Sequence, residues 1–176
     1  MKNLNQTQQL HQVLRVNHAG EYGAKQIYAG QLAVFRLKKD QSSVDLIEHM
    51  KHQEDLHFDY FNKKIIEQKV RPTLMQPLWK VAGFTLGFAT ALMGKKAAMA
   101  CTVAVEEIID EHYQSQLNYL EGNENLKENI EKFRQEELEH RNIGLQNQAE
   151  DLLIYKPFSF FIKSASKLAI AISTKI

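Results

Sequence analysis

The chain is poor in residues that cross-link a protein or interrupt helices. Its 176 residues include one cysteine, three prolines and eight glycines. The single cysteine, Cys101, excludes an intramolecular disulfide, a zinc ribbon and an iron–sulfur cluster held by thiolates. Because proline and glycine are scarce, long helices can form without interruption. The composition therefore favours a helical protein without a cysteine-based site.

The chain also lacks an excess of either charge and any long apolar run. Its net charge is +1, so no overall field attracts nucleic acid, and we expect no nucleic-acid partner. The longest uncharged run, residues 81–94, is shorter than the roughly 20 residues that a membrane-spanning helix needs. The N-terminal stretch is polar, so we expect no secretory signal and a bacterial protein on the cytoplasmic side.

Apolar residues recur with helical spacing along the chain, and no stretch alternates as a strand does. Hydrophobic residues make up 44% and charged residues 24%, which is typical of a folded domain. The predicted helices span residues 5–38, 44–69, 78–94, 96–121, 126–152 and 158–175. We expect one all-α domain over residues 1–176. It would be a four-helix bundle of two hairpins with an apolar crossover helix and a C-terminal amphipathic helix.

The motif Glu-x-x-His occurs twice, each time in the middle of a predicted helix. Glu54 and His57 form the first copy, and Glu137 and His140 form the second. Residues three apart lie on one helix face, so both side chains of a copy point the same way. A glutamate on the stripe of another helix precedes each copy at a similar interval. The six residues are Glu21, Glu54, His57, Glu106, Glu137 and His140.

All six residues lie on the apolar stripes, where an isolated carboxylate is costly to bury. Four carboxylates carry four negative charges, which two divalent metal ions would balance, and two neutral imidazoles would complete the ligand set. One glutamate from each of two helices, with Glu-x-x-His from each of the other two, is the di-iron or di-manganese pattern of ferritin-like bundles. Structural zinc prefers cysteine and histidine, and calcium prefers loop oxygens. We therefore predict a di-metal centre in a ferritin-like bundle.

The sequence around these residues resembles the demethoxyubiquinone hydroxylases of ubiquinone biosynthesis. The resemblance covers nearly the whole chain from about Leu14, and the block from Ala97 to Val105 that leads into Glu106 is especially specific. The matching stretches are RVNHAGEYGAKQIYAGQ (15–31), HMKHQEDLHF (49–58), PLWKVAGFTLGFATALMGKKAAMACTVAVEEIIDEHY (77–113) and KFRQEELEHRNIGL (132–145).

The resemblance implies a ferritin-like fold with two iron ions as cofactor, held by the same six residues. It implies a monooxygenase that hydroxylates the demethoxyubiquinol ring with dioxygen, the step before the last O-methylation. It also implies a peripheral protein on the cytoplasmic side of the bacterial cell membrane that holds its polyprenyl quinol substrate. Because the chain has no Gly-rich nucleotide motif, an external electron donor is expected. A homo-oligomer or a complex of ubiquinone-biosynthesis proteins is a further expectation.

Two residues near the six are candidate catalytic residues. Tyr113 lies on the helix face of Glu106 and could relay an electron or a proton from the quinol, and His112 precedes it. An ordinary core tyrosine is the alternative for Tyr113. Glu107 and Glu136 lie one position, about 100°, off the ligand stripe, so we do not expect them to hold metal.

Other polar residues are expected to support the ligands. Asn17 and Asp110 each lie four residues from a ligand glutamate and are candidates for orienting it. His18 and His49 lie off the ligand stripe, so we expect a supporting or capping role for them rather than metal contact.

Two apolar segments are flanked or interleaved by lysines, a pattern of membrane-surface helices. These are residues 81–94 and residues 158–176. Together they predict an apolar mouth through which a polyprenyl quinone enters from the bilayer. A packed crossover helix is the alternative for the first segment. Its small residues Gly83, Gly87 and Ala89 are expected to let a ligand chain or a second subunit approach closely.

Two other functions stay open. An iron-storage or detoxification cage would need a soluble surface and a large closed assembly, and it leaves the apolar tail unexplained. A non-catalytic helical scaffold on a membrane would not need six metal ligands. A rubrerythrin-type peroxidase is disfavoured, because one cysteine cannot make a rubredoxin site.

Overall fold

The computed structural model describes residues 5–117, 120 and 122–176. Among these residues it contains helices and no strand, so the predicted all-α fold is confirmed. The elements are α1 (Gln6–Leu37), α2 (Gln41–Glu67), α3 (Gln76–Leu92), α4 (Lys95–Leu117), α5 (Glu124–Gln146), the short 3-10 helix η1 (Ala149–Asp151) and α6 (Tyr155–Lys175).

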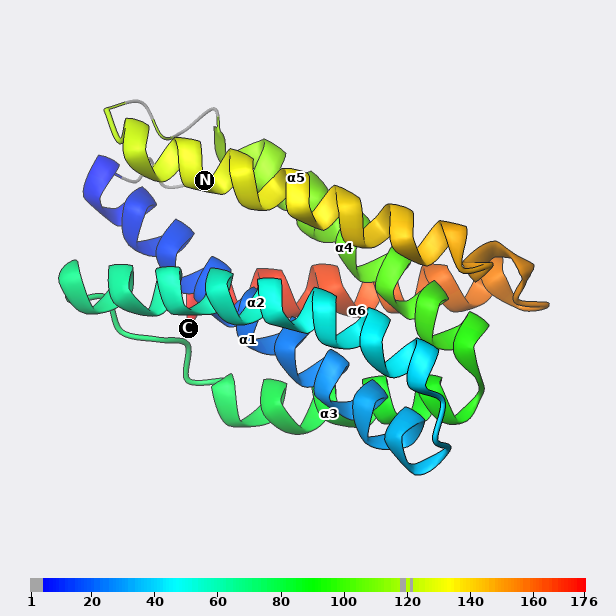
Figure 1. Cartoon of the computed structure of the whole chain (residues 1–176). Helices are drawn as coiled ribbons and strands as arrows, with labels where there is room; N and C mark the ends of the chain where they lie inside the picture. Colours follow the sequence, from blue (N-terminus) through cyan, green and yellow to red (C-terminus); the bar gives the residue numbers. More distant parts are fainter. Residues whose placement is uncertain (1–4, 118–119, 121) are drawn as a thin grey trace.

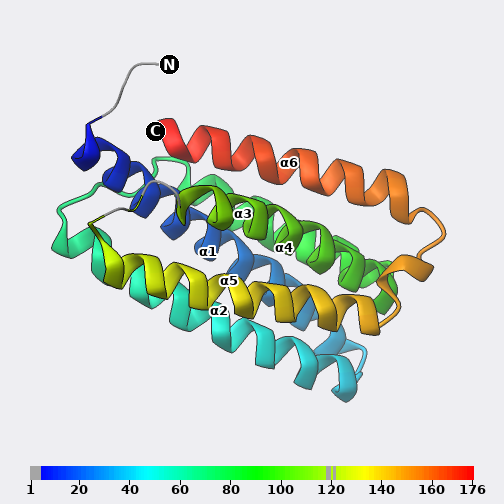
Figure 2. The same ribbon diagram turned by 90° about the horizontal axis from the view of Figure 1, so that it is seen from above.

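Two helical hairpins make the four-helix bundle. α1 packs against α2 and α4 against α5, and the hairpins face each other through α1 with α4 and α2 with α5 (Figures 1 and 2). α3 runs along α1 as the crossover, and α6 packs on α4 and α1. None of the helices in the described part of the chain is long and apolar enough to cross a membrane.

The turn between α1 and α2 places the first glutamate level with the first Glu-x-x-His. α1 continues to Leu37, as the predicted helix over residues 5–38 requires. Lys39 then takes a positive φ of 56°, and the Asp40 side chain accepts a hydrogen bond from the backbone N–H of Ser43 at 3.1 Å. This N-cap satisfies one of the free donors at the start of α2.

Glycines let α1 and α3 approach backbone to backbone. A Cβ on Gly87 would overlap the carbonyl oxygen of Ile27, and a Cβ on Gly30 would overlap that of Phe84. A Cβ on Gly83 would lie 2.9 Å from the carbonyl oxygen of Gly23. α1 therefore fills the space beside Gly87, and the expectation of a ligand chain or a second subunit there is wrong, whereas Gly83 also lines an apolar cavity between α1, α3, α4 and α6.

Some helix ends differ from the prediction. α5 ends at Gln146 instead of residue 152, because Gln148 adopts a left-handed φ of 64° and η1 follows. α6 begins at Tyr155 instead of residue 158, and it includes Pro157 in its first turn, where a missing N–H costs little. α4 is described to Leu117, and residues 118, 119 and 121 of the predicted third bundle helix lie outside the described residues.

The apolar core has two parts inside the bundle, one on each side of a polar layer. On α2, Ile47 and Met50 belong to one part, and Phe61 and Ile65 belong to the other. Glu54 and His57 lie between them in sequence and are equally buried. The four helices thus surround a layer of charged residues with apolar side chains above and below it.

Candidate metal centre

The structure brings the six predicted ligand residues together from four helices. α1 supplies Glu21, α4 supplies Glu106, and α2 and α5 supply one Glu-x-x-His each; all six residues are at most 1% exposed. Their ligand atoms form two overlapping groups, each within 4.8 Å, and Glu54 and Glu137 belong to both. The groups are Glu21, Glu54, His57 and Glu137, and Glu54, Glu106, Glu137 and His140.

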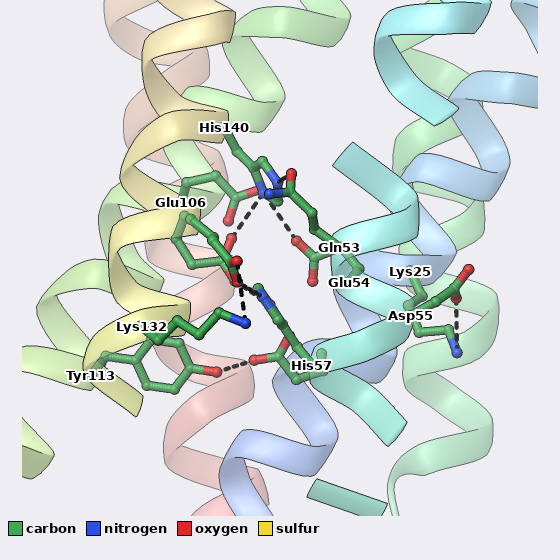
Figure 3. A network of polar contacts seen from close by, with 12 residues as sticks. Lys25, Gln53, Glu54, Asp55, His57, Glu106, Tyr113, Lys132 and His140 are labelled. Atoms are coloured by element: carbon green, nitrogen blue, oxygen red, sulfur yellow. Dashed lines mark hydrogen bonds and ion pairs between the residues drawn. The ribbon is translucent and has the colours of Figure 1, made fainter. Parts of the chain in front are cut away.

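Both imidazoles turn the same nitrogen toward the carboxylates. His57 Nδ1 lies 3.1 Å from Glu137 Oε1 and 3.4 Å from Glu21 Oε2. His140 Nδ1 lies 3.0 Å from Glu137 Oε2 and 3.2 Å from Glu54 Oε1. Figure 3 shows Glu54, His57, Glu106 and His140 converging between the helices. In this arrangement Nδ1 is the nitrogen that each histidine would offer to a metal ion.

The outer nitrogen of each histidine is held by the residue that precedes the glutamate of the opposite motif. His57 Nε2 lies 2.7 Å from Glu136 Oε2, and His140 Nε2 lies 2.8 Å from Gln53 Oε1. Such contacts fix the ring orientation and leave Nδ1 free to bind. Glu136 lies off the ligand stripe and was not expected to hold metal, and Gln53 was not among the predicted site residues. Their shared position before each Glu-x-x-His was the available signal.

Two buried tyrosines hold the glutamates that α1 and α4 contribute. Tyr28 donates a hydrogen bond to Glu106 Oε1 at 2.7 Å, and Tyr113 donates one to Glu21. Each tyrosine follows the glutamate of its own helix by about two helical turns, so it lies on the same face. Burial, followed by the nearby carboxylates, raises the pKa of both phenols well above the usual value. Tyr28 was not among the predicted site residues.

Burial sets the charge state of the metal-free cluster. Burial, followed by the charge of Glu137, raises the pKa of Glu54 and Glu106 well above the usual range. Burial opposes the charge of His57 and His140 too, but their hydrogen bonds with Glu137 and the negative charge of a second nearby glutamate raise their pKa to about 12 and about 11. Those two histidines lower the pKa of Glu137 despite its burial.

Several carboxylate oxygens in this layer have no hydrogen-bond donor. They are Glu21 Oε2, both oxygens of Glu54 and Glu106 Oε2. Buried oxygens without a donor are rare in folded proteins and call for a cation or another explanation. Four carboxylates and two imidazoles facing one another therefore fit two divalent ions, with Glu54 and Glu137 placed to be shared.

His112 lies outside this layer. Its Nε2 is 2.7 Å from Gln116 Nε2, and Gln116 and Asn17 exchange two hydrogen bonds of 2.8 and 2.7 Å. Burial lowers the pKa of His112 to about 4. Its catalytic role stays a prediction. The described contacts of Asn17 lead to Gln116 instead of to a ligand glutamate, so the expectation that Asn17 orients one is not met.

The remaining predicted neighbours also point elsewhere. Asp110 accepts a hydrogen bond from Arg134 at 2.7 Å, which links α4 to α5 and does not orient a ligand. Glu107 forms an ion pair with Lys163 of α6. His18 is buried, and its ring packs against Phe58 at a tilt of 36° with ring centroids 4.8 Å apart. His49 is exposed.

An apolar cavity of about 180 Å³ lies beside the polar layer. Its walls include Gly20 and Val105, which precede Glu21 and Glu106 in the chain. The other wall residues come from α1, α3, α4 and α6, and they are almost all apolar or small. The cavity thus lies between α3, α6 and the two helices that carry Glu21 and Glu106.

The comparisons with known proteins agree with this geometry. The chain is 49% identical over 171 residues to the mitochondrial NADPH-dependent 3-demethoxyubiquinone 3-hydroxylase of Dictyostelium discoideum, covering 95% of this chain and 77% of that protein. It is 49% identical over 164 residues to the 3-demethoxyubiquinol 3-hydroxylase of Rhodospirillum rubrum, covering 93% and 76%. The human NADPH-dependent 3-demethoxyubiquinone 3-hydroxylase is 46% identical over 170 residues, covering 93% and 76%.

The family model described as ubiquinone biosynthesis protein COQ7 matches residues 8–173, a range that includes all six residues of the cluster. Both observations, the matched sequence and the buried cluster of four glutamates and two histidines, concern the same residues. This chain therefore belongs to the family of ubiquinone biosynthesis protein COQ7.

Proposed function

We propose that this protein is a di-iron monooxygenase that hydroxylates the ring of a demethoxyubiquinol with dioxygen in ubiquinone biosynthesis. The observation that carries the proposal is the buried cluster of four glutamates and two histidines, in which several carboxylate oxygens accept no hydrogen bond. The substrate and the reaction are supported by the names of the relatives, which are 3-demethoxyubiquinol or 3-demethoxyubiquinone 3-hydroxylases.

We propose a role for each ligand from its place in the two overlapping groups. Glu21 and His57 would hold one iron ion, Glu106 and His140 would hold the other, and Glu54 and Glu137 would be shared. When bound, the two ions supply the redox chemistry that activates dioxygen. Tyr28 and Tyr113 donate to one oxygen each of Glu106 and Glu21, which fixes these carboxylates. The apolar side chains above and below the layer exclude water from it.

The apolar cavity offers a route for a lipid substrate. It lies between α3 and α6, and Gly20, Gly23 and Ala24 make its wall on α1 small and apolar. A quinol ring placed there would lie against the helices that carry Glu21 and Glu106. The polyprenyl tail would extend along the apolar walls toward the surface.

The surface near the cavity supports peripheral attachment to a membrane. α6 exposes Phe160 and Phe161 at 74% and 68%, and α3 exposes Val81 at 64%. Two lysines of α6 lie beside acids of α4: Lys163 contacts Glu107, and Lys167 contacts the exposed Glu111 at 3.0 Å. Apolar side chains beside lysines favour the interface of a bilayer with anionic lipids. We propose that this face attaches to the cytoplasmic side of the cell membrane.

An external donor must supply two electrons for each turnover. One oxygen atom of dioxygen enters the ring as a hydroxyl, and the other leaves as water with two electrons and two protons. The names of the Dictyostelium and human relatives specify NADPH dependence. We propose a reduced nicotinamide nucleotide as the donor class here, bound without a dedicated nucleotide domain.

Isotopically heavy dioxygen tests the function. Iron-loaded protein, a short-chain demethoxyquinol and reduced nicotinamide are incubated under heavy dioxygen, and the product is identified by mass spectrometry. We expect a new ring hydroxyl that carries the heavy atom. The same hydroxyl with oxygen from water contradicts a monooxygenase. Iron uptake without any hydroxylated product, in a protein shown to hold two irons, instead favours iron storage.

A further inference from the structure

The two hairpins contribute to the cluster in matched pairs, apart from one position. Glu21 corresponds to Glu106, Tyr113 to Tyr28, and the two Glu-x-x-His copies correspond to each other. The groups that hold the outer nitrogens of the histidines break this match. His57 is held by a carboxylate, whereas His140 is held by an amide (Figure 3 labels the amide, Gln53).

This substitution changes the charge around one metal position. The contact of His57 Nε2 with Glu136 is a hydrogen bond to a charged acceptor, and such bonds are about twice as strong as bonds to neutral acceptors. A carboxylate on the outer N–H increases the electron density that Nδ1 donates to a metal ion. The Gln53 oxygen orients His140 in the same way but adds no charge.

Surface cations do not cancel the difference. Lys132 Nζ lies 3.8 Å from Glu136 Oε1, and its side chain is 67% exposed. An ion pair at this separation with an exposed lysine contributes little, because water screens it. The Glu136 side chain itself is 25% exposed, so its oxygen toward His57 lies on the inner side of a partly covered carboxylate. The negative charge behind His57 is therefore retained.

We propose that the two metal positions bind with unequal affinity, and that Glu136 makes the position of Glu21 and His57 the tighter one, which fills first. The inference rests on the di-metal centre proposed above. Glu136 acts as a positioning residue, since it reaches the metal only through His57. Gln53 leaves the position of Glu106 and His140 the weaker one.

Cobalt(II) titration of the metal-free protein without oxygen tests this order. Binding is followed by visible absorption in competition with a chelator of known affinity. We expect two steps in the wild-type protein, the first about tenfold tighter or more. Glu136→Gln should weaken the first step about 10- to 100-fold, the usual range for losing such a partner, and leave the second nearly unchanged. Gln53→Glu should strengthen the second step and bring the two affinities together.

Glu139→Gln is the matched control, because it removes the same charge from an exposed position of α5. It should change neither step. The inference is overturned if Glu136→Gln leaves the first step unchanged or weakens both steps equally. Diffraction with anomalous signal from crystals that hold one equivalent of cobalt gives a second measurement: a peak beside His57 is expected, and a peak beside His140 contradicts the order. If the wild-type protein binds no cobalt at all, the proposed centre itself fails.

Discussion

Adjacent residues of one helix have opposite surroundings in this protein. Glu106 points into the cluster and accepts from Tyr28, whereas Glu107 pairs with Lys163 on α6. A rotation of about 100° between neighbours accounts for the difference. These two residues therefore give a sharp test of which side chains hold metal.

Glu106→Gln should remove most of the stabilisation by metal and have little effect on the metal-free protein. Burial raises the pKa of Glu106 well above its usual range, which favours the neutral acid that glutamine imitates. Iron at about 100 times its dissociation constant stabilises a fold by about 2.7 kcal/mol, or roughly 5–10 °C in Tm at this size. Thermal unfolding with and without anaerobic iron(II) measures this gain. Glu107→Gln is the control and should keep the stabilisation by iron. If only Glu107→Gln loses this stabilisation, Glu107 and not Glu106 is the ligand.

His112 should make the stability depend on pH. Burial lowers its folded pKa to about 4, below the value of about 6.5 in an unfolded chain. Between these values the unfolded state binds more protons, so stability falls as the pH falls from about 7 to about 4. Because His112 is partly exposed, we discount the full effect of the pKa shift. The free energy of unfolding of the wild type should fall by about 1 kcal/mol more than that of His112→Gln between pH 7.5 and pH 5. Urea unfolding of the metal-free proteins measures the loss, and exposed His52→Gln should behave like the wild type.

The helix stripes were sufficient to predict which six residues meet, because their burial depends mainly on helical period. The contacts around them were not predictable in this way. Glu136 and Gln53 lie off the stripe of their own helices. Their role depends on a contact with the histidine of the facing helix. Asn17 and Asp110 share a face with ligands, yet Gln116 and Arg134 offer closer partners. Such pairings depend on how helices are rotated against one another, which spacing alone does not give.

At the scale of helices, the contact between α1 and α3 controls where the cavity lies. Gly83 and Leu86 line the cavity, while the glycines at 30 and 87 seat α3 directly on α1. A helix held this closely cannot move away without losing its packing. The crossover therefore forms a fixed wall of the proposed substrate route.

Gly87→Ala should destabilise the fold by about 2 kcal/mol or more. Its Cβ would overlap the carbonyl oxygen of Ile27, so one backbone must shift. Gly23→Ala is the matched control: nothing lies within 4 Å of its added Cβ, and alanine is the better helix former by about 0.5–1 kcal/mol. Thermal unfolding should lower the Tm of the first variant and raise that of the second. A Gly87→Ala protein as stable as the wild type would contradict the close approach of the two helices.

The helix count and order followed from the sequence, whereas two features of the helices did not. The small residues of α3 are compatible with a ligand beside the helix and with a close contact to another helix. Only the packing in the structure distinguishes these two arrangements. The early end of α5 depends on the positive φ of Gln148, a residue that rarely adopts this conformation. The apolar periodicity of the sequence continues past Gln148, so it does not indicate that the helix ends there.

At the scale of the molecule, exposed aromatic side chains of α6 should control membrane attachment. Phe160→Ser with Phe161→Ser removes the two large exposed aromatic side chains of α6. We expect binding to vesicles with anionic lipid to fall about tenfold or more, because each aromatic side chain contributes about 1.5–3 kcal/mol when fully buried. Sedimentation with the vesicles measures binding. Leu56→Ser with Ile66→Ser on α2 is the control, with similar exposure; an equal loss there would exclude a role for this face.

The position of the cluster between the hairpins has a consequence for the chain as a whole. Residues 21 and 140 are far apart in sequence, and the two hairpins meet at this layer through ligands of both. Metal bound there would join the N-terminal and C-terminal halves, as a disulfide does in secreted proteins. With one cysteine, buried in the core, the chain has no covalent means of doing so. Its cross-link would instead be reversible, and its strength would follow the supply of iron in the cell.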